Sequence, residues 1–168
     1  MAADVYAADE QADVPVDVER WGNLARAVLD AEGVTADAEV SLLFVDEAAI
    51  AALNERFLAN EGPTDVLAFP IEDEGALSGR SPDTGGTGPA TIKRGTDQLL
   101  LLGDVVVCPA VAARNAVEHE VPLEDELALL VVHGILHLLG MDHVLTHEAE
   151  RMEERERQLL ARFHHPAR

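Results

Sequence analysis

The sequence predicts a single α+β or mixed α/β domain, in which a small sheet is covered by helices. The chain has 168 residues, the length of one ordinary domain. Its apolar patterns change from helical spacing to strand-like runs and back, in the order helix, strand, helix, strand, loop, strand and three helices. Apolar residues make up 48% of the chain and charged residues 26%, which is typical of a soluble globular domain.

The N-terminal part begins with an acidic segment and continues into a helix and a strand. Residues 1–16 are small, acidic and without periodicity, which predicts a flexible arm. Apolar residues at helical spacing follow, and Asp17 can cap this helix while Gly33 can end it. The apolar run 39–45 predicts the first strand. We therefore expect the folded domain to begin at residue 17.

The next part predicts a second helix, a second strand and a long loop. Asp46 can cap the helix, and the apolar run 64–69 predicts the strand. Residues 73–97 are rich in Gly, Pro, Ser and Thr, which predicts a flexible loop inserted into the domain. This loop carries Lys93 and Arg94, and long loops in compact domains are either functional or disordered.

The last part predicts one central strand followed by three helices. The strongly apolar run 99–108 predicts the strand, and Pro109 can open the first of the helices. The next helix, over 123–139, is apolar nearly all round, which indicates that it is buried. Thr146 can cap the last helix, and we expect the tail 164–168 to be frayed.

The acidic composition limits the functions that the chain can perform. Thirty-two Asp and Glu face twelve Lys and Arg, which gives a formal net charge of -20. Sequence-independent binding of a nucleic acid requires a broad basic surface that neutralises many phosphates, so this class of function is excluded. Any function on a polyanion must therefore come from a local positive centre.

The sequence also indicates a compartment. Cys108 is the only cysteine, so no intramolecular disulfide can form. The N-terminal segment lacks the basic and apolar regions of a secretory signal, and no apolar stretch reaches the roughly 18 residues of a membrane span. We expect a cytoplasmic protein without membrane attachment.

A cluster of histidines is the strongest chemical signal. The segment from His133 to His143 reads HGILHLLGMDH. His133 and His137 are four residues apart on the predicted helix, so their imidazoles share one face and can bind one ion. Gly140 can turn the chain back, which lets His143 return as a third ligand. The sequence therefore predicts a metal site made of three histidines.

This ligand set predicts an open, catalytic site rather than a closed, structural one. Structural zinc sites normally have four ligands, usually including thiolates, and Cys108 is the only thiol in the chain. Three imidazoles leave one coordination position open, and such sites lower the pKa of bound water to about 7. Zinc, one ion per chain, is the expected metal, although the ligand types also suit nickel, copper or manganese.

The spacing H-x3-H-x2-G-x2-H is also that of the metzincin proteases. Those enzymes carry a Glu directly after the first His, where it acts as the general base. Here that position is Gly134, which cannot transfer a proton. Peptidase chemistry of the usual kind is therefore not expected. The sequence leaves the general base or acid unknown: the metal, another carboxylate or the substrate could activate water.

Three aspartates are further candidates. Asp142 adjoins His143 and could orient a ligand imidazole, or it could bond its own backbone in a turn. Asp104 lies in an apolar strand, where it could orient a histidine or the zinc water, or anchor the strand. Asp65 opens a strand and is expected to be a local cap. No site role is expected for His119, His147, His164 and His165.

Two further segments accompany the histidine motif HGILHLLGMDH: PTDVLAFP at 63–70 and GDVVVC at 103–108. Together the three segments resemble the HGxLHLxGYDH, PTDVLSFP and GDIVIC motifs of the YbeY family of single-domain, metal-dependent endoribonucleases. The resemblance covers about residues 18–163. It implies a zincin-like α+β domain, over 17–163, with a small mixed four-stranded sheet and about five or six helices.

The resemblance also implies a function. Members of this family are single-strand-specific endoribonucleases that act in ribosomal RNA maturation and ribosome quality control. By this resemblance His133, His137 and His143 are the zinc ligands, and pre-ribosomal RNA is the substrate. The implied partners are small-subunit ribosomal proteins or assembly factors, and neither DNA nor a membrane is implied.

Three departures from the family pattern bear on packing or activity. Ala68 and Met141 replace the usual Ser and Tyr, which we interpret as packing changes. Leu58 stands where many members have an Arg that is considered important for activity. We expect another basic residue to supply this charge. The candidates are Arg114 and, as substrate-binding residues of the loop, Lys93 and Arg94.

Two other functions also fit the sequence. Gly134 and Leu58, both of which lack an expected catalytic side chain, fit a ribosome-assembly factor or RNA chaperone whose metal is mainly structural. The spacing of the histidines alone fits a metallopeptidase or amidase.

Overall fold

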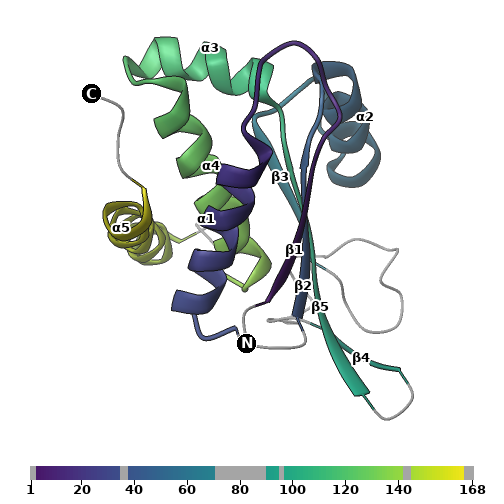
Figure 1. The fold of residues 1–168 in the computed structure, drawn as a ribbon. Helices are drawn as coiled ribbons and strands as arrows, with labels where there is room; N and C mark the ends of the chain where they lie inside the picture. The colour runs from purple at the N-terminus through teal and green to yellow at the C-terminus, as the bar shows by residue number, and fades with distance from the viewer. Residues whose placement is uncertain (1–2, 35–37, 71–89, 95–96, 142–144, 165–168) are drawn as a thin grey trace.

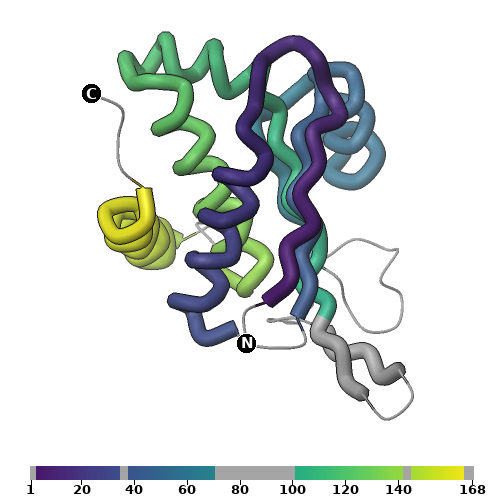
Figure 2. Tube along the Cα trace, viewed as in Figure 1, coloured from purple at the N-terminus to yellow at the C-terminus, as the bar shows by residue number. Residues whose placement is uncertain are grey.

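The computed structural model describes residues 3–34, 38–70, 90–94, 97–141 and 145–164, and between 90 and 100 it describes only the backbone. Figures 1 and 2 show the same view of the chain as a ribbon and as a tube. The elements in chain order are β1 (Asp4–Asp9), α1 (Val18–Ala31), β2 (Ala38–Phe44), α2 (Glu47–Leu58), β3 (Val66–Pro70), β4 (Ala90–Arg94), β5 (Asp97–Val107), α3 (Pro109–His119), α4 (Leu123–Leu138) and α5 (Thr146–Phe163).

The sheet has the order β1-β2-β5-β3, and β4 pairs with β5 as well. The first three strands of this order run parallel, whereas β3 and β4 are antiparallel to β5. Residues 66–70 pair with 103–107 of β5, and residues 90–94 pair with 97–101. β3 and β4 therefore follow one another along one edge of β5, while β2 occupies the other edge. The predicted mixed sheet with four strands abreast is confirmed, with β4 as an addition.

The prediction of a flexible arm over 1–16 is wrong for residues 4–9. They form β1, which pairs in parallel with β2 and lies beside it along its whole length (Figure 2). Val5 is 7% exposed and belongs to the main core, while Tyr6 points outward with 66% of its surface exposed. The acidic composition of this segment did not indicate a strand. The strand forms nevertheless, because its hydrogen bonds come from β2, a parallel partner distant in sequence.

The predicted loop over 73–97 also requires a correction. Residues 90–94 form β4, and β5 already begins at Asp97, so this end of the segment is a β-hairpin. Its composition favours turns, but backbone pairing with the long β5 strand overrides that preference. Residues 71–89 lie outside the described residues.

The two faces of the sheet carry different layers (Figure 1). α1 and α4 cover one face, with α5 packed outside them, and α2 lies on the other face. Alternation along β5 separates the two layers: Val105 and Val107 belong to the larger core with α1 and α4, whereas Val106 belongs to a smaller core with Ile50 of α2. α4 is thus buried between the sheet and α5, as its uniformly apolar sequence predicts.

The helix ends agree with most of the sequence signals. Asp17 caps α1 by accepting from the Arg20 amide, and Asp46 caps α2 by accepting from the Ala49 amide. The prediction of a Thr146 cap is wrong, because α5 begins at that residue, after Leu145 and without a side-chain cap. Among the described helices, none combines the length and apolarity that crossing a bilayer requires.

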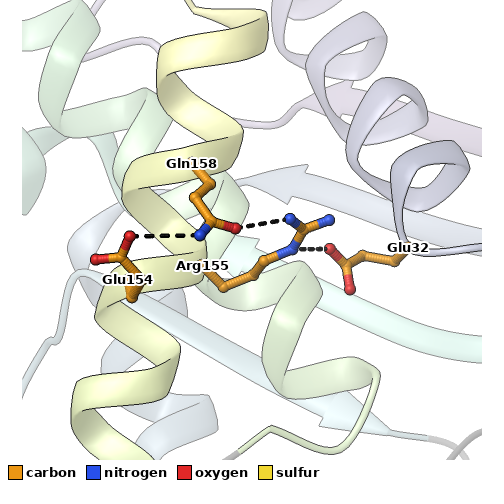
Figure 3. A network of polar contacts seen from close by, with 4 residues as sticks. All are labelled: Glu32, Glu154, Arg155 and Gln158. Atoms are coloured by element: carbon orange, nitrogen blue, oxygen red, sulfur yellow. Dashed lines mark hydrogen bonds and ion pairs between the residues drawn. The ribbon is translucent and has the colours of Figure 1, made fainter.

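Polar contacts fix α5 on the helical layer. Arg155 points from α5 to Glu32 at the end of α1, with 2.5 Å between Nε and Oε1, and it also donates to Gln158 (Figure 3). At the far end, His164 is buried and lies 2.8 Å from Asp125 at the start of α4. His164 is therefore anchored rather than frayed, because burial of the ring beside a carboxylate holds it; residues 165–168 lie outside the described residues.

Candidate metal centre

α4 brings two of the three predicted ligands together. The Nε2 atoms of His133 and His137 lie 3.1 Å apart, and their ring centroids are separated by 4.6 Å. Two nitrogens bound to one tetrahedral ion at about 2.0–2.1 Å are themselves about 3.3–3.4 Å apart. The two histidines therefore converge, through the same ring nitrogen, with a separation that fits a shared ion.

A buried carboxylate stands behind the first of these histidines. Nδ1 of His133 lies 2.5 Å from Oε2 of Glu156 on α5, and the two side chains are 28% and 9% exposed, respectively. An ionised carboxylate only accepts hydrogen bonds, so this contact assigns the proton to Nδ1. The lone pair of Nε2 then points toward His137, as a metal ligand requires.

Gly134 explains how closely α4 can approach the sheet. A Cβ atom at this position would lie 2.5 Å from Cγ1 of Val105 on β5, well inside van der Waals contact. A glutamate here, as in the metzincins, would have to push α4 off β5. The close packing of α4 on β5 is therefore a physical reason why a glutamate does not fit at this position.

A cavity of about 440 Å³ opens beside His133 and Glu156. Its wall is formed by the start of β3, the end of α3 and the facing sides of α4 and α5. The lining residues are Asp65, Val66, His119, Glu126, Leu129, Leu130, His133, Ala149, Met152, Glu153 and Glu156. Because four of them are carboxylic acids, this wall carries negative charge next to the predicted metal ligand.

A second histidine–glutamate pair lies on the same cavity. Nδ1 of His119, at the end of α3, is 2.9 Å from Oε1 of Glu126, a residue of α4 that is 4% exposed. The hydrogen bond to Glu126 is the main cause that raises the pKa of His119. Nearby, Asn115 donates to Asp65, so Asp65 is tied to α3 rather than being only a local cap.

Asp104 lies on the opposite face of the sheet from the histidines. Its neighbour Val105 contacts α4, and successive residues of a strand point to opposite faces. Burial raises the pKa of Asp104, against the effect of a hydrogen bond with Ser41 of β2. The structure therefore does not bring Asp104 to His133 or His137, which argues against its orienting a ligand.

For the basic residues predicted to contact RNA, the structure describes the side chain of Arg114 but only the backbone of Lys93 and Arg94. Arg114 forms an ion pair with Glu47 at the start of α2, and the hydrogen bond between them is the main cause that lowers the pKa of Glu47. Leu58, in the family's Arg position, ends α2 with 47% of its surface exposed. Lys93 and Arg94 lie in β4, where only the backbone is described.

The third predicted ligand cannot be compared with the first two. His143 and Asp142 lie outside the described residues. Within the residues that the structure does describe, no group of three or more His, Cys, Asp or Glu side chains could hold a metal ion. The His133–His137 pair is thus the described part of the predicted site.

Glu156 and Glu126 line the cavity beside His133 and were not predicted from the sequence. Glu156 stands four residues after Met152 on the apolar side of the last helix, and Glu126 stands on the nearly all-apolar fourth helix. A carboxylate within an apolar face requires a partner, so both positions did carry a signal. The identity of each partner depends on which helix packs against which.

Comparison with known proteins identifies relatives of the whole domain. A family model described as "Endoribonuclease YbeY" matches residues 6–164. A protein named endoribonuclease YbeY from Thermobifida fusca is 43% identical over 149 residues, which cover 88% of this chain and 86% of the relative. Another of that name, from Moorella thermoacetica, is 44% identical over 156 residues, covering 91% and 92%.

A solved structure has the same fold. The solution structure of TM1509 from Thermotoga maritima superimposes with a TM-score of 0.54 at 23% sequence identity. The match covers 95% of this chain and 90% of that one. At this identity the likeness concerns the fold, and it supports the α+β architecture described above.

Proposed function

The chain belongs to the YbeY family of endoribonucleases, and from this premise we propose a zinc-dependent, single-strand-specific endoribonuclease that processes ribosomal RNA. Membership of the family makes the protein a hydrolase that cuts RNA internally. The observation that supports the metal-dependent reaction is the convergence of the two Nε2 atoms, 3.1 Å apart, with Glu156 bonded behind His133.

His133, His137 and His143 would hold the ion, His143 being assigned by the sequence motif. When bound, zinc would supply Lewis-acid chemistry at a phosphoryl oxygen of the RNA. The chain's own contribution is to hold two imidazoles with their Nε2 atoms close together. Since Gly134 offers no base, another group of the protein would have to accept the proton of the nucleophile, which is either water or the ribose 2′-hydroxyl of the substrate.

We also infer how the substrate reaches the site. A net charge of -20 and the acidic wall beside His133 both repel a polyanion. Free RNA should therefore bind weakly, and small-subunit ribosomal proteins or assembly factors would present pre-ribosomal RNA to the site. The proposed function includes action in the cytoplasm, in ribosomal RNA maturation and ribosome quality control.

Metal analysis combined with RNA cleavage tests this proposal. The wild-type protein should bind one zinc per chain and cut single-stranded RNA faster than duplex RNA, and both metal and cleavage should be lost in His137→Ala. Cleavage that survives a chelator would contradict the proposal. Stoichiometric metal without cleavage, on free RNA and on RNA presented by ribosomal particles, would favour an assembly factor with a structural metal. A peptide substrate serves as the control, because the packing of Gly134 leaves no place for the metzincin base.

A further inference from the structure

Glu156 is a buried carboxylate that contacts the predicted metal ligand His133. We propose that Glu156 is a positioning residue, which holds His133 in the tautomer and ring orientation that present Nε2 to a metal ion. This inference rests on the proposed function, because it takes His133 as a metal ligand. Glu156 itself would contact neither the metal nor the RNA.

The position of Glu156 on α5 requires a specific partner. Met152, Glu156 and Leu159 share one side of the helix, and the two apolar members are each 1% exposed. A carboxylate among such neighbours is costly unless it is hydrogen-bonded or paired. The structure gives it His133, with 2.5 Å between Oε2 and Nδ1.

This contact determines the direction of the His133 lone pair. A neutral imidazole has one N–H donor and one acceptor nitrogen, and the carboxylate selects the proton on Nδ1. Nε2 is then the acceptor, and it is the atom that lies 3.1 Å from Nε2 of His137. Without Glu156, the proton could move to Nε2 and block the ligand position.

The helical layer supplies Glu156 in a fixed place. Its neighbour Arg155 is bound to Glu32 of α1, and His164, eight residues further along, is bound to Asp125 of α4. These contacts hold α5 on either side of Glu156. The carboxylate thus comes from a docked helix, which suits a residue that must aim a ligand.

Other carboxylates near His133 provide an internal control. Glu153, on the preceding turn of α5, lines the same cavity as Glu156, together with Glu126 and Asp65. If only negative charge mattered, loss of Glu153 would weaken a metal site as much as loss of Glu156. If the hydrogen bond to Nδ1 matters, only Glu156 should be required.

Three variants separate these possibilities. Glu156→Leu removes the oxygen that accepts from Nδ1 of His133. Because leucine suits the apolar face of α5, this variant should fold, with a Tm close to or above that of the wild type. Glu156→Gln keeps a carbonyl oxygen that can accept from Nδ1 and should act as the conservative rescue. Glu153→Ala is the matched control, because it removes one carboxylate from the same cavity.

The first readout is the tautomer of His133 in the metal-free protein, measured by nitrogen-15 NMR of the imidazoles. The wild type, Glu156→Gln and Glu153→Ala should all show the proton on Nδ1. Glu156→Leu should show the Nε2–H form or a mixture. A His133 ring that keeps its proton on Nδ1 in Glu156→Leu would overturn the proposal without any reference to metal.

The second readout is zinc affinity, measured by competition with a chromogenic chelator. Glu156→Leu should lose about 10- to 100-fold, the usual effect of removing the carboxylate behind a ligand histidine. Glu156→Gln should lose less, and Glu153→Ala should stay near the wild type. Equal affinities of wild type and Glu156→Leu would overturn this inference alone, whereas a wild type that binds no zinc, or a His137→Ala variant that binds as tightly, would overturn the proposed function.

Discussion

The two histidine–glutamate pairs on the cavity have the same chemistry and different surroundings. In both, a nearly buried carboxylate meets Nδ1 of an imidazole: Glu156 with His133, and Glu126 with His119. The His133 side chain is 28% exposed and has a second imidazole one helical turn away, whereas the His119 side chain is 56% exposed and ends α3. We interpret this difference as what separates the predicted ligand His133 from His119, an ordinary paired histidine.

A carboxylate partner fixes the ring in both cases, but it does not by itself make a metal site. On α4 the fixed ring converges with His137 because four residues form about one turn of helix. At His119 the same pairing acts instead on proton affinity, raising the pKa of the ring. We therefore interpret two features together as the metal-binding arrangement: a second histidine four residues away on the same helix, and a carboxylate bonded to the first histidine.

Exchanging each histidine for alanine gives the largest expected difference between the two pairs. His133→Ala removes a ligand and should weaken zinc binding by more than about 100-fold, beyond the usual effect of losing an outer partner. His119→Ala should keep one zinc per chain. Metal content after dialysis against a weak chelator measures both, and loss of zinc in His119→Ala would show that the two pairs act as one site.

The packing beneath His133 should also be sensitive to a single methyl group. In Gly134→Ala the new Cβ would lie 2.5 Å from Val105, so we expect overpacking to destabilise the fold by about 1–3 kcal/mol. This exceeds the gain of up to about 1 kcal/mol from replacing a helical glycine by alanine. Urea denaturation measures the difference.

A double variant is the control for this clash. Combining Gly134→Ala with Val105→Ala removes the atoms that collide and should recover part of the lost stability. If Gly134→Ala is instead more stable than the wild type, α4 does not depend on this close approach, and the packing reason for the missing glutamate is wrong.

The stability of the fold should depend on pH through the His119–Glu126 pair. Its pKa is raised from about 6.5, mainly by the hydrogen bond to Glu126. The stabilisation is therefore fully present below the unfolded-state value and is lost as pH rises through the higher folded-state value. Glu126→Gln should return the pKa of His119 toward 6.5, measured by NMR titration, and reduce the loss of stability over that range. An unchanged pKa would show that another group holds the ring.

The smallest effect is expected on the far side of the sheet. Burial raises the pKa of Asp104, so ionisation of this carboxyl opposes folding. Stability therefore falls as the pH rises from the unfolded-state pKa through the higher folded-state pKa. Asp104→Asn should therefore raise the Tm at pH 7 by no more than about 4 °C. RNA cleavage should remain at the wild-type rate, because Asp104 lies on the face away from α4. A strong loss of cleavage would return Asp104 to the site.

Much of the architecture followed from local signals. Alternating and helical apolar patterns located β2, β3, β5 and the five helices of the described residues, and Asp17 and Asp46 marked helix starts that the structure confirms. The acidic segment containing β1 and the turn-rich segment containing β4 gave no such signal, because both strands depend on pairing with a neighbour. Local composition is therefore a poor predictor of a strand whose stability comes mainly from pairing with a neighbouring strand.

The amino-acid sequence alone was enough to predict the two converging histidines, since four-residue spacing on a helix places side chains on one face in any surroundings. It was also enough to show that position 134 has no base and that the net charge is -20, from which we predict weak binding of free RNA. The packing of the elements was needed to find which carboxylate contacts His133, which one pairs with His119, and that Asp104 faces away from α4. Those relations join separate elements, and they depend on how α5 docks on α4 and which way the β5 strand turns its side chains.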